Sequence, residues 1–409
     1  MKILLVSDSY GLVDGVSRSI ETELQFFQDR GDTVTVISTN TAYTSTYKLS
    51  AYRNFYRVFD ANPRNLVRSL RGIRFDVAYG HCVGPQGLFF LLYLSSRLGL
   101  PMVNRFTTYA PDYMVYAYPP NSGPVVQKGI RWMLTWLLGI TQRRVQRVLL
   151  SVYCEKMLRY LVDNLGVKQY RIIENRFPMR SKPPLRTRPR RRTCADPIRL
   201  ITPGRISAEK NIELLISVWN DELVDRYPNA EWYLVGSGPL LDTVRQRVRG
   251  PDRVRTLGEV SHQRMLREMV EADLMLYASL GDTFGLVITE AKLCRLPIIA
   301  LADNAGVSAQ IRDGEIGGYL ATDLAGFVHR MHNALANPLQ LIDIAECGAD
   351  DVNKRFGFDQ HHQLADILER TVLTPPSRIH RLTTLAASRI VRLLCWTLPR
   401  AFVRMYERV

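Results

Sequence analysis

The stretch Ile198-Arg-Leu-Ile-Thr-Pro-Gly-Arg-Ile-Ser-Ala-Glu-Lys-Asn211 has the pattern of one strand-to-helix unit. Its first residues, Ile198–Ile201, form a short apolar run typical of a buried strand, and Gly204 then permits a tight turn. We expect a helix to start at Asn211. Further apolar runs predict strands at Trp232–Val235, Val254–Leu257, Leu274–Tyr277 and Pro297–Leu301. This repetition indicates a parallel sheet with helices on both faces.

The first 175 residues show the same rhythm. The expected strands are Lys2–Val6, Thr33–Ile37, Asp76–Tyr79, Met102–Val103, Arg147–Ser151 and Arg171–Ile173. Helical spacing is found, for example, in Ser17–Gln28 and Gly87–Leu98. Between the two series, residues 178–197 hold five prolines among arginines, which excludes a helix or a central strand and predicts a linker.

We therefore predict an α/β chain with two doubly wound, Rossmann-like domains facing a cleft, because ligands of such sheets bind at the carboxyl ends of the strands. The expected divisions are a first Rossmann-like domain at 1–177, the linker at 178–197, a second Rossmann-like domain at 198–355, a closing helix region at 356–375 and a basic amphipathic tail at 376–409.

Composition narrows the class of protein. The 409 residues are 46% hydrophobic and 23% charged, enough apolar content for large cores. No apolar run approaches the length needed to span a bilayer, and the N-terminus does not resemble a signal peptide. The six cysteines are scattered without a Cys-x-x-Cys pair, which favours the reducing cytosol over a disulfide framework or a zinc site.

The net charge of +15 is concentrated in two segments. Residues 168–198 hold ten Lys and Arg against two acids, and residues 376–409 hold seven Arg against one acid. The remaining chain is close to neutral and has no basic stripe with interleaved aromatic residues. We therefore expect no nucleic-acid partner.

The tail at 376–409 has helical spacing. One arc of the helix carries four arginines, and the adjoining face carries apolar residues up to Pro399. This pattern suits an anionic bilayer surface, at roughly 1 kcal/mol per favourable charge, so we expect a peripheral protein on the inner leaflet whose core ends before Pro375. The stretch 128–147, with Trp132 and Trp136, is similar. The alternatives are a protein partner for the tail and ordinary packing of 128–147 on its own sheet.

Two turns that follow strands in the C-terminal half of the chain are predicted to bind phosphate. Arg205 and Lys210 lie between a strand end and a helix start, where cations and helix N-termini attract anions. Gly236-Ser-Gly238 follows the next strand and would let backbone approach a ligand closely. The alternative for the two cations is a solvated loop.

The segment Asp282-Thr-Phe-Gly-Leu-Val-Ile-Thr-Glu290 carries two carboxylates around a helix start. Backbone N–H groups of Phe284, Gly285, Leu286 and Val287 would form a second anion cradle. Glu290 suits a ribose diol and Asp282 a sugar hydroxyl. Each acid taken alone also fits a helix cap or a surface position.

These motifs, in this order and spacing, resemble the donor domain of the retaining GT-B glycosyltransferases of glycosyltransferase family 4, whose acid-x7-acid motif usually begins with Glu. The resemblance implies that Arg205 and Lys210 hold a diphosphate, that Glu290 holds the ribose, and that Asp282 holds a hydroxyl of the donor sugar. The segment 301–320 also resembles the family.

The N-terminal half is similar to the glycolipid-forming branch, which includes diacylglycerol glycosyltransferases, sulfolipid synthases and phosphatidylinositol mannosyltransferases. Residues 8–20 resemble the glycine loop in which Gly15 would approach the donor phosphates, and residues 75–88 and 100–116 carry the rest of the likeness. The branch usually has a histidine against the donor sugar where this chain has Thr107. His81, at a neighbouring strand end, is a further candidate on the acceptor or donor-sugar side.

The resemblance implies transfer of a sugar from a nucleotide-diphosphate sugar to a lipid or lipid-linked acceptor, with retention of anomeric configuration. The cations and helix amides would stabilise the leaving diphosphate, so we expect no metal and no cofactor. Two alternatives are transfer to a soluble glycan or small molecule, and a degenerate protein that binds nucleotide sugar without turnover. Thr107 favours the second of these, and the intact donor motif opposes it.

Overall fold

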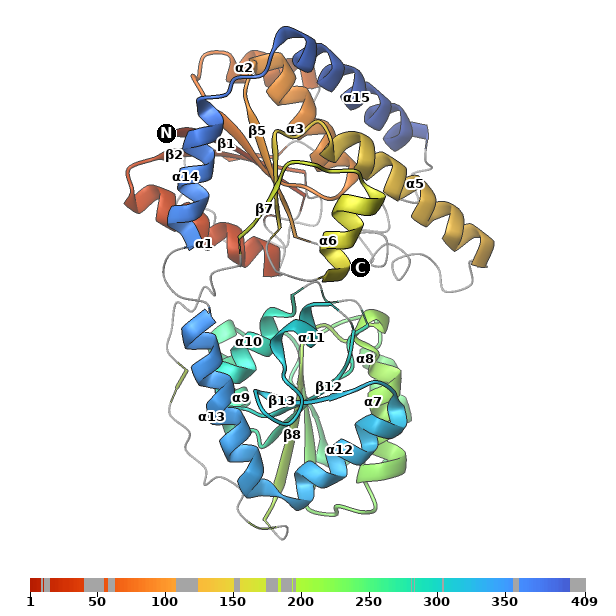
Figure 1. The fold of residues 1–409 in the computed structure, drawn as a ribbon. Coiled ribbons are helices and arrows are strands. Elements are labelled where there is room, and N and C mark those ends of the chain that lie inside the picture. Colours follow the sequence, from red (N-terminus) through yellow and green to blue (C-terminus); the bar gives the residue numbers. More distant parts are fainter. Residues whose placement is uncertain are drawn as a thin grey trace. The chain divides into compact units, whose positions relative to one another are not determined.

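The chain folds as two compact units, Met1–Pro178 with Phe358–Val409 and Met179–Gly357. The computed structural model describes residues 1–8, 10, 15–39, 55–57, 63–107, 124–150, 155–173, 183–184, 193, 196–280, 282, 284–303, 305–355 and 360–397. Most of the expected linker therefore lies outside the described residues. The second unit is one continuous stretch, whereas the first is built from both ends of the chain (Figure 1).

The first unit is built on a parallel seven-stranded sheet. Its strand order is β3 (Phe55–Arg57), β2 (Thr33–Ser38), β1 (Lys2–Ser7), β4 (Val77–His81), β5 (Met102–Phe106), β6 (Arg147–Leu150) and β7 (Tyr170–Ile172). Its helices are α1 (Gly15–Asp29), α2 (Pro63–Leu70), α3 (Pro85–Leu98), α5 (Pro124–Gln142), α6 (Glu155–Arg159) continued by a π-helical turn (Tyr160–Asn164), α14 (Gln360–Val372) and α15 (Arg378–Thr397).

The last two helices pack on the first unit. Leu364, Ala365 and Leu368 of α14 share a buried cluster with Ile3 and Leu5 of β1. Helix α15 lies along α3, where the Ser96 hydroxyl donates a 2.6 Å hydrogen bond to the Arg381 carbonyl. Residues 378–397 thus cover α3, contrary to the expectation that the core ends before Pro375, and the rest of the tail, 398–409, lies outside the described residues.

The second unit is built on a parallel six-stranded sheet. Its strand order is β10 (Val254–Thr256), β9 (Ala230–Val235), β8 (Ile198–Pro203), β11 (Leu274–Tyr277), β12 (Ile298–Leu301) and β13 (Gly318–Ala321). Its α-helices are α7 (Ile212–Val218), α8 (Leu241–Arg247), α9 (His262–Glu271), α10 (Leu286–Leu293), α11 (Gly306–Gln310), α12 (Leu324–Ala336) and α13 (Pro338–Arg355). Short helical turns span Ala208–Lys210, Trp219–Leu223 and Pro251–Arg253.

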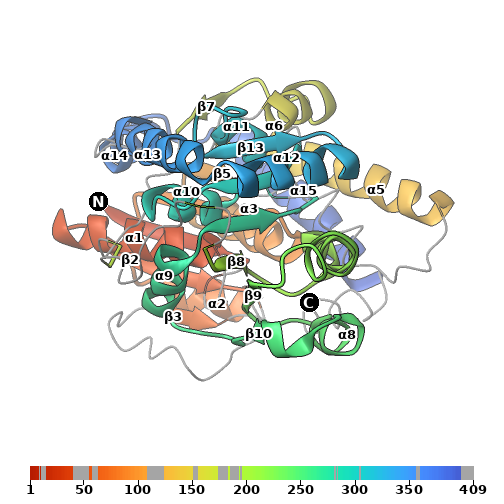
Figure 2. The same cartoon turned by 90° about the horizontal axis from the view of Figure 1, so that it is seen from below.

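Helices cover both faces of this second sheet (Figure 2). One buried cluster joins α7 and α12 through Ile216, Phe327 and Met331. The other joins α9 and α10 through Met269 and Ile288. The strands therefore bury apolar side chains on both faces of the sheet. This explains why their sequences are continuous apolar runs.

The predicted fold class, two doubly wound parallel sheets, is confirmed, and each strand expected from an apolar run is present. The sequence analysis missed two strands, β3 and β13, and β13 begins with Gly318. A side chain there would collide with the β12 backbone, because its Cβ would lie 2.0 Å from the Ile298 carbonyl oxygen. Among the described helices, none combines the length and apolarity that crossing a bilayer requires.

Candidate nucleotide-sugar site in the second unit

The turn after β8 supplies two basic side chains. A 3₁₀ turn, Ala208–Lys210, follows Arg205, and α7 begins at Ile212. The Glu209 carbonyl accepts hydrogen bonds from the Leu280 N–H, at 2.9 Å, and from the Ser279 hydroxyl, at 3.3 Å. These bonds fix the turn against the loop that follows β11, so residues from two neighbouring strand ends meet.

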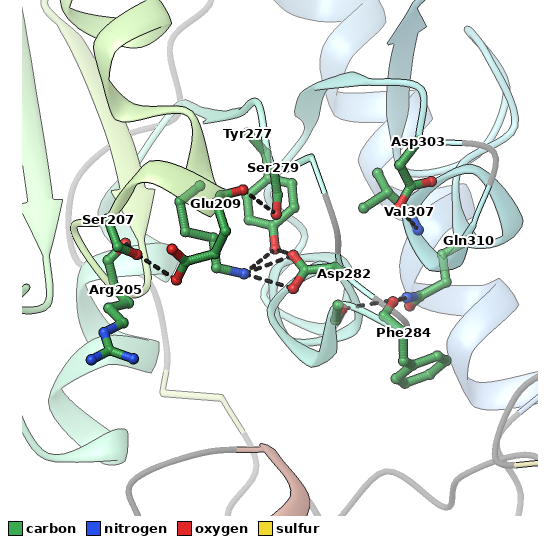
Figure 3. Close-up of polar contacts among 12 residues, drawn as sticks. Arg205, Ser207, Glu209, Tyr277, Ser279, Asp282, Phe284, Asp303, Val307 and Gln310 are labelled. Atoms are coloured by element: carbon green, nitrogen blue, oxygen red, sulfur yellow. Dashed lines mark hydrogen bonds and ion pairs between the residues drawn. The ribbon is translucent and has the colours of Figure 1, made fainter. Parts of the chain in front are cut away.

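Lys210, from the turn after β8, contacts residues at the end of β11 and in the loop after it (Figure 3). Its ammonium group donates to Oδ1 and Oδ2 of Asp282, at 2.7 and 2.8 Å, and to the Tyr277 hydroxyl at 3.2 Å. The Tyr277 hydroxyl also donates to Asp282. Lys210 and Asp282 each keep 20% of their side-chain surface exposed, so a ligand can reach both charges.

Arg205 has a different environment. Within the described part of the chain, its guanidinium makes no hydrogen bond or ion pair, and Figure 3 shows it extending away from the Lys210 cluster. The neighbouring Ser207 hydroxyl instead donates to Glu209, at 2.5 Å. Arg205 is therefore a half-buried cation whose five donors are available to an anionic ligand.

The two glycines after β9 serve the turn beside them. A Cβ on Gly236 would lie 1.9 Å from the Gly204 carbonyl oxygen, and one on Gly238 would lie 2.4 Å from the Ile206 carbonyl oxygen. Gly236 also has a φ of +143°. The two turns are further tied by the Ile206 N–H, which donates to the Ser237 carbonyl at 3.0 Å. Glycine is therefore required at both positions because the backbone of the β8 turn packs against them. The sequence analysis had instead expected a ligand to approach these glycines.

The start of α10 is the helix N-terminus for which the sequence predicts an anion cradle. Gly285 adopts a left-handed conformation with φ +70°, and α10 begins at Leu286. The Ile288 N–H donates to the Gly285 carbonyl at 2.9 Å, whereas the N–H groups of Leu286 and Val287 belong to the turn that a helix cannot satisfy itself. Phe284 is buried and anchors the segment.

Gln310 holds this helix start in place. Its amide nitrogen donates to the Phe284 carbonyl, and to the Gly285 carbonyl at 3.3 Å (Figure 3). Its amide oxygen accepts from the Thr289 hydroxyl at 2.5 Å. Behind it, the buried ammonium of Lys292 donates to the Gln310 carbonyl at 2.8 Å and to Asp351 at 2.5 Å.

Glu290 lies in the second turn of α10 and is nearly buried. One carboxylate oxygen, Oε1, lies 2.8 Å from Nε2 of His262, the first residue of α9. Burial and the nearby negative charge of Glu290 raise the pKa of the Cys294 thiol to about 12. The His262 contact orients the Glu290 carboxylate.

Gln310, His262, Tyr277 and Lys292 were not identified from the sequence. His262 and Gln310 come from elements that are 28 and 20 residues away from Glu290 along the chain, and only the fold brings them together. A signal was available for Tyr277, because it is the last residue of a predicted strand whose carboxyl end was already assigned to the site.

The first-unit candidates have other surroundings. His81 ends β4 with no exposed side-chain surface, and its Nε2 lies 2.9 Å from Oε2 of Glu23, which also pairs with Arg105. This burial argues for a structural role in place of sugar contact. Thr107 directly follows β5 and is half-buried. Gly15 is the first residue of α1, and the glycine loop before it lies outside the described residues.

Burial by itself would raise the pKa of Glu23, but attraction to His81 and Arg105 lowers it to about 2. No group of three or more His, Cys, Asp or Glu suited to a metal ion occurs among the described residues. Metal independence stays a prediction.

Comparison with known proteins finds a family match for the second unit. Residues 197–337 match the family model described as Glycosyl transferases group 1. The chain is 32% identical over 108 residues to one component of the human phosphatidylinositol N-acetylglucosaminyltransferase, covering 26% of this chain and 22% of that protein. It is 23% identical over 308 residues to the Arabidopsis thaliana sulfoquinovosyl transferase SQD2, covering 71% and 57%. It is 30% identical over 132 residues to the α-monoglucosyldiacylglycerol synthase of Acholeplasma laidlawii, covering 32% and 33%. The matches thus span between about a fifth and three fifths of these relatives' own lengths.

Solved structures agree on the fold. The chain is similar to HepE from Anabaena, solved with UDP-glucose, with a TM-score of 0.69, 18% identity and coverage of 90% of this chain and 100% of that one. It is also similar to the sucrose-phosphate synthase of Thermosynechococcus elongatus, with a TM-score of 0.68, 16% identity and coverage of 90% and 98%. The solved structures thus share the fold of this chain, and residues 197–337, which hold the motifs at the carboxyl ends of β8, β9 and β11, match the Glycosyl transferases group 1 family.

Proposed function

We propose that this protein transfers a sugar from a nucleotide-diphosphate sugar to a lipid or lipid-linked acceptor and retains the anomeric configuration. The observation that carries the proposal is the grouping of Arg205, the Lys210–Asp282 pair and the α10 start at one edge of the family-matched sheet. The glycolipid-related names of the curated relatives support a lipid acceptor.

The donor diphosphate would lie between Arg205 and the N–H groups of Leu286 and Val287. In the reaction, the bond from the anomeric carbon to the phosphate oxygen breaks, and negative charge grows on the leaving diphosphate. Arg205 and Lys210 stabilise this charge without a metal ion or another cofactor. The acceptor hydroxyl attacks the same face of the sugar, and its proton passes to the leaving phosphate oxygen. Chelator treatment should therefore leave the rate unchanged.

Lys210 must rearrange when the donor binds, because its three donors are engaged by Asp282 and Tyr277. A phosphate oxygen would replace one of these contacts. Asp282 would then be freer to accept a hydrogen bond from a hydroxyl of the donor sugar. Glu290, oriented by His262, would accept from the ribose hydroxyls.

The test is a transfer assay over a panel of nucleotide sugars, with diacylglycerol and phosphatidylinositol in detergent as acceptors and soluble sugars as the comparison. Arg205→Ala should lower turnover by about two orders of magnitude. The matched control, Arg245→Ala on the exposed face of α8, should not change it. Faster transfer to soluble sugars than to either lipid would favour the soluble acceptor, and donor binding without turnover would favour the degenerate protein.

A further inference from the structure

Helix α15 packs against the first unit with its small side chains. Its buried positions are Thr384, Ala387, Ser388 and Val391, which share one side of the helix. Helix α15 lies along α3 (Figures 1 and 2), so we infer that its buried side faces α3. Ordinary surface helices bury their large apolar residues, so this arrangement is reversed.

The large apolar side chains of α15 point to solvent. Ile379 is 75% exposed, Leu382 is 59% exposed and Leu393 is 65% exposed, and Ile390 shares their side. At 3.6 residues per turn, these four fall within an arc of about 80°. The described part of the chain thus shows a continuous apolar stripe on α15 that protein does not cover.

Arginines occupy the sector next to this stripe. Arg378, Arg381, Arg389 and Arg392 are all exposed, and α15 contains no Asp or Glu. The Arg392 guanidinium lies 6.0 Å from the ring centre of Phe89 on α3, so α15 is also anchored through its basic side. The large exposed side chains of α15 are therefore either apolar or positively charged.

Helix α5 lies beside α15 and has the same character (Figures 1 and 2). Trp132 is 70% exposed and Trp136 is 42% exposed, with Lys128 and Arg131 on the same helix. Helix α5 also contains no Asp or Glu. Exposed tryptophans flanked by basic residues are typical of the lipid–water interface, where one end of the ring is apolar and the other wet.

We propose that α5 and α15 together form the face with which this protein lies on an anionic lipid surface. Two neighbouring helices with exposed apolar residues, exposed cations and no acid match the acyl boundary and the negative headgroups at once. The sequence analysis placed this role on the tail and left 128–147 open between a similar role and packing on its own sheet. The exposure of Trp132 and Trp136 favours the first of these for α5. This proposal adds a membrane-binding face to the proposed transfer of sugar to a lipid acceptor. Its biological purpose rests on that proposed function.

Substitution of exposed residues in the full-length chain tests the face without uncovering α3. The apolar variant is Ile379→Ser with Leu393→Ser, and the basic variant is Arg378→Gln with Arg389→Gln. Their matched controls are Leu339→Ser, which is also exposed, and Arg226→Gln with Arg267→Gln, all in the second unit. Each protein is co-sedimented with vesicles of phosphatidylcholine alone or mixed with phosphatidylglycerol, at low and high salt.

We expect the unmodified chain to sediment with the mixed vesicles and to bind less at high salt. The apolar variant should lose at least about tenfold in affinity at both salt concentrations. The basic variant should lose about fivefold per charge at low salt and little at high salt. Brominated lipid should quench tryptophan fluorescence, and Trp132→Phe with Trp136→Phe should remove most of that quenching. Donor hydrolysis should be unchanged in every variant.

Equal sedimentation of the variants and their controls would overturn the proposal. So would a change in oligomeric state with no vesicle binding, which would identify a second copy of the chain as the occupant. Vesicle binding without sugar transfer would refute the lipid-acceptor function and leave this face standing. Transfer to detergent-dispersed lipid without vesicle binding would do the reverse.

Discussion

Lys210 and Asp282 form one ion pair, although the sequence assigns them to different parts of a donor, the diphosphate and the sugar. The pair brings a cation and an anion to the same point of the strand edge. Its consequence is that the two side chains respond to a phosphate in opposite ways, since one attracts it and the other repels it.

Lys210→Ala should therefore weaken binding of a nucleoside diphosphate by about tenfold, the value of a hydrogen bond between charged groups. Asp282→Asn should keep or strengthen that binding while lowering sugar transfer by about two orders of magnitude. Calorimetry with nucleoside diphosphates and a transfer assay measure the two effects. Lys354→Ala, an exposed lysine on α13, is the control. Equal loss of diphosphate binding in both variants would mean that the pair acts only as a structural unit.

Gln310→Met should weaken nucleoside diphosphate binding about tenfold, because the start of α10 loses the amide that fixes the carbonyls of Phe284 and Gly285. The free energy of unfolding should fall by about 1–3 kcal/mol, since buried polar groups lose their partners. Titration calorimetry and denaturant unfolding measure the two quantities. Gln340→Met, on the exposed side of α13, should change neither. Unaltered nucleotide affinity in a destabilised Gln310→Met would remove Gln310 from the site.

Gly236→Ala should destabilise the second unit far more than Gly258→Ala. Both glycines have positive φ, but a Cβ on Gly258 meets open space, whereas one on Gly236 meets the Gly204 carbonyl oxygen at 1.9 Å. The Gly258 substitution should cost about 1–2 kcal/mol, the ordinary penalty of a left-handed residue. Denaturant unfolding followed by the fluorescence of Trp219 and Trp232 compares them. Similar losses would show that the two turns separate easily.

Glu23 predicts acid sensitivity of the first unit. Its pKa is about 2 in the fold against 4.5 for the free side chain, so its contribution to stability is full above 4.5 and is lost as pH falls towards 2. The gap in unfolding free energy between the unmodified chain and Glu23→Gln should be about 3–5 kcal/mol at pH 7 and should shrink below pH 4.5. Hydrogen exchange of β1 and β4 peptides during denaturant unfolding reports this unit. Asp29→Asn, exposed on the same helix, should show no such trend.

Thr107→His should change which nucleotide sugar is used fastest. Thr107 lies directly after β5, at a strand end, and a different side chain there changes the hydrogen bonds available to a sugar. The measurement is kcat/KM across the donor panel for both proteins. An unchanged donor order, or no turnover with any donor in either protein, would favour the binding protein without turnover.

The sequence predicted the strands well because buried parallel strands are short apolar runs, and it predicted the donor motif because polar residues directly follow those runs. Gln310 and His262 could not be found this way, since their roles depend on elements that the fold alone brings beside α10. The sequence predicted that a ligand would closely approach the backbone at Gly236 and Gly238. Their nearest neighbour is instead the backbone of the turn after β8.

Helix α15 shows another limit of sequence reasoning. The spacing of its arginines and apolar residues defined two faces correctly, but a helical pattern does not say which face meets the protein. Small residues such as Ala387 and Ser388 carry almost no signal in such a pattern, and they are the ones that α15 buries. Docking against α3 had to be seen in the structure.

The return of α14 to the first sheet also sets an order of events during synthesis. Leu364, Ala365 and Leu368 complete the core around β1, yet they leave the ribosome after the whole of Met179–Gly357. The second unit, which is continuous in sequence, can fold as soon as it emerges, because domains fold as units during translation. The N-terminal sheet must wait with part of its apolar surface open until α14 arrives, so the part of the protein made first is the part finished last.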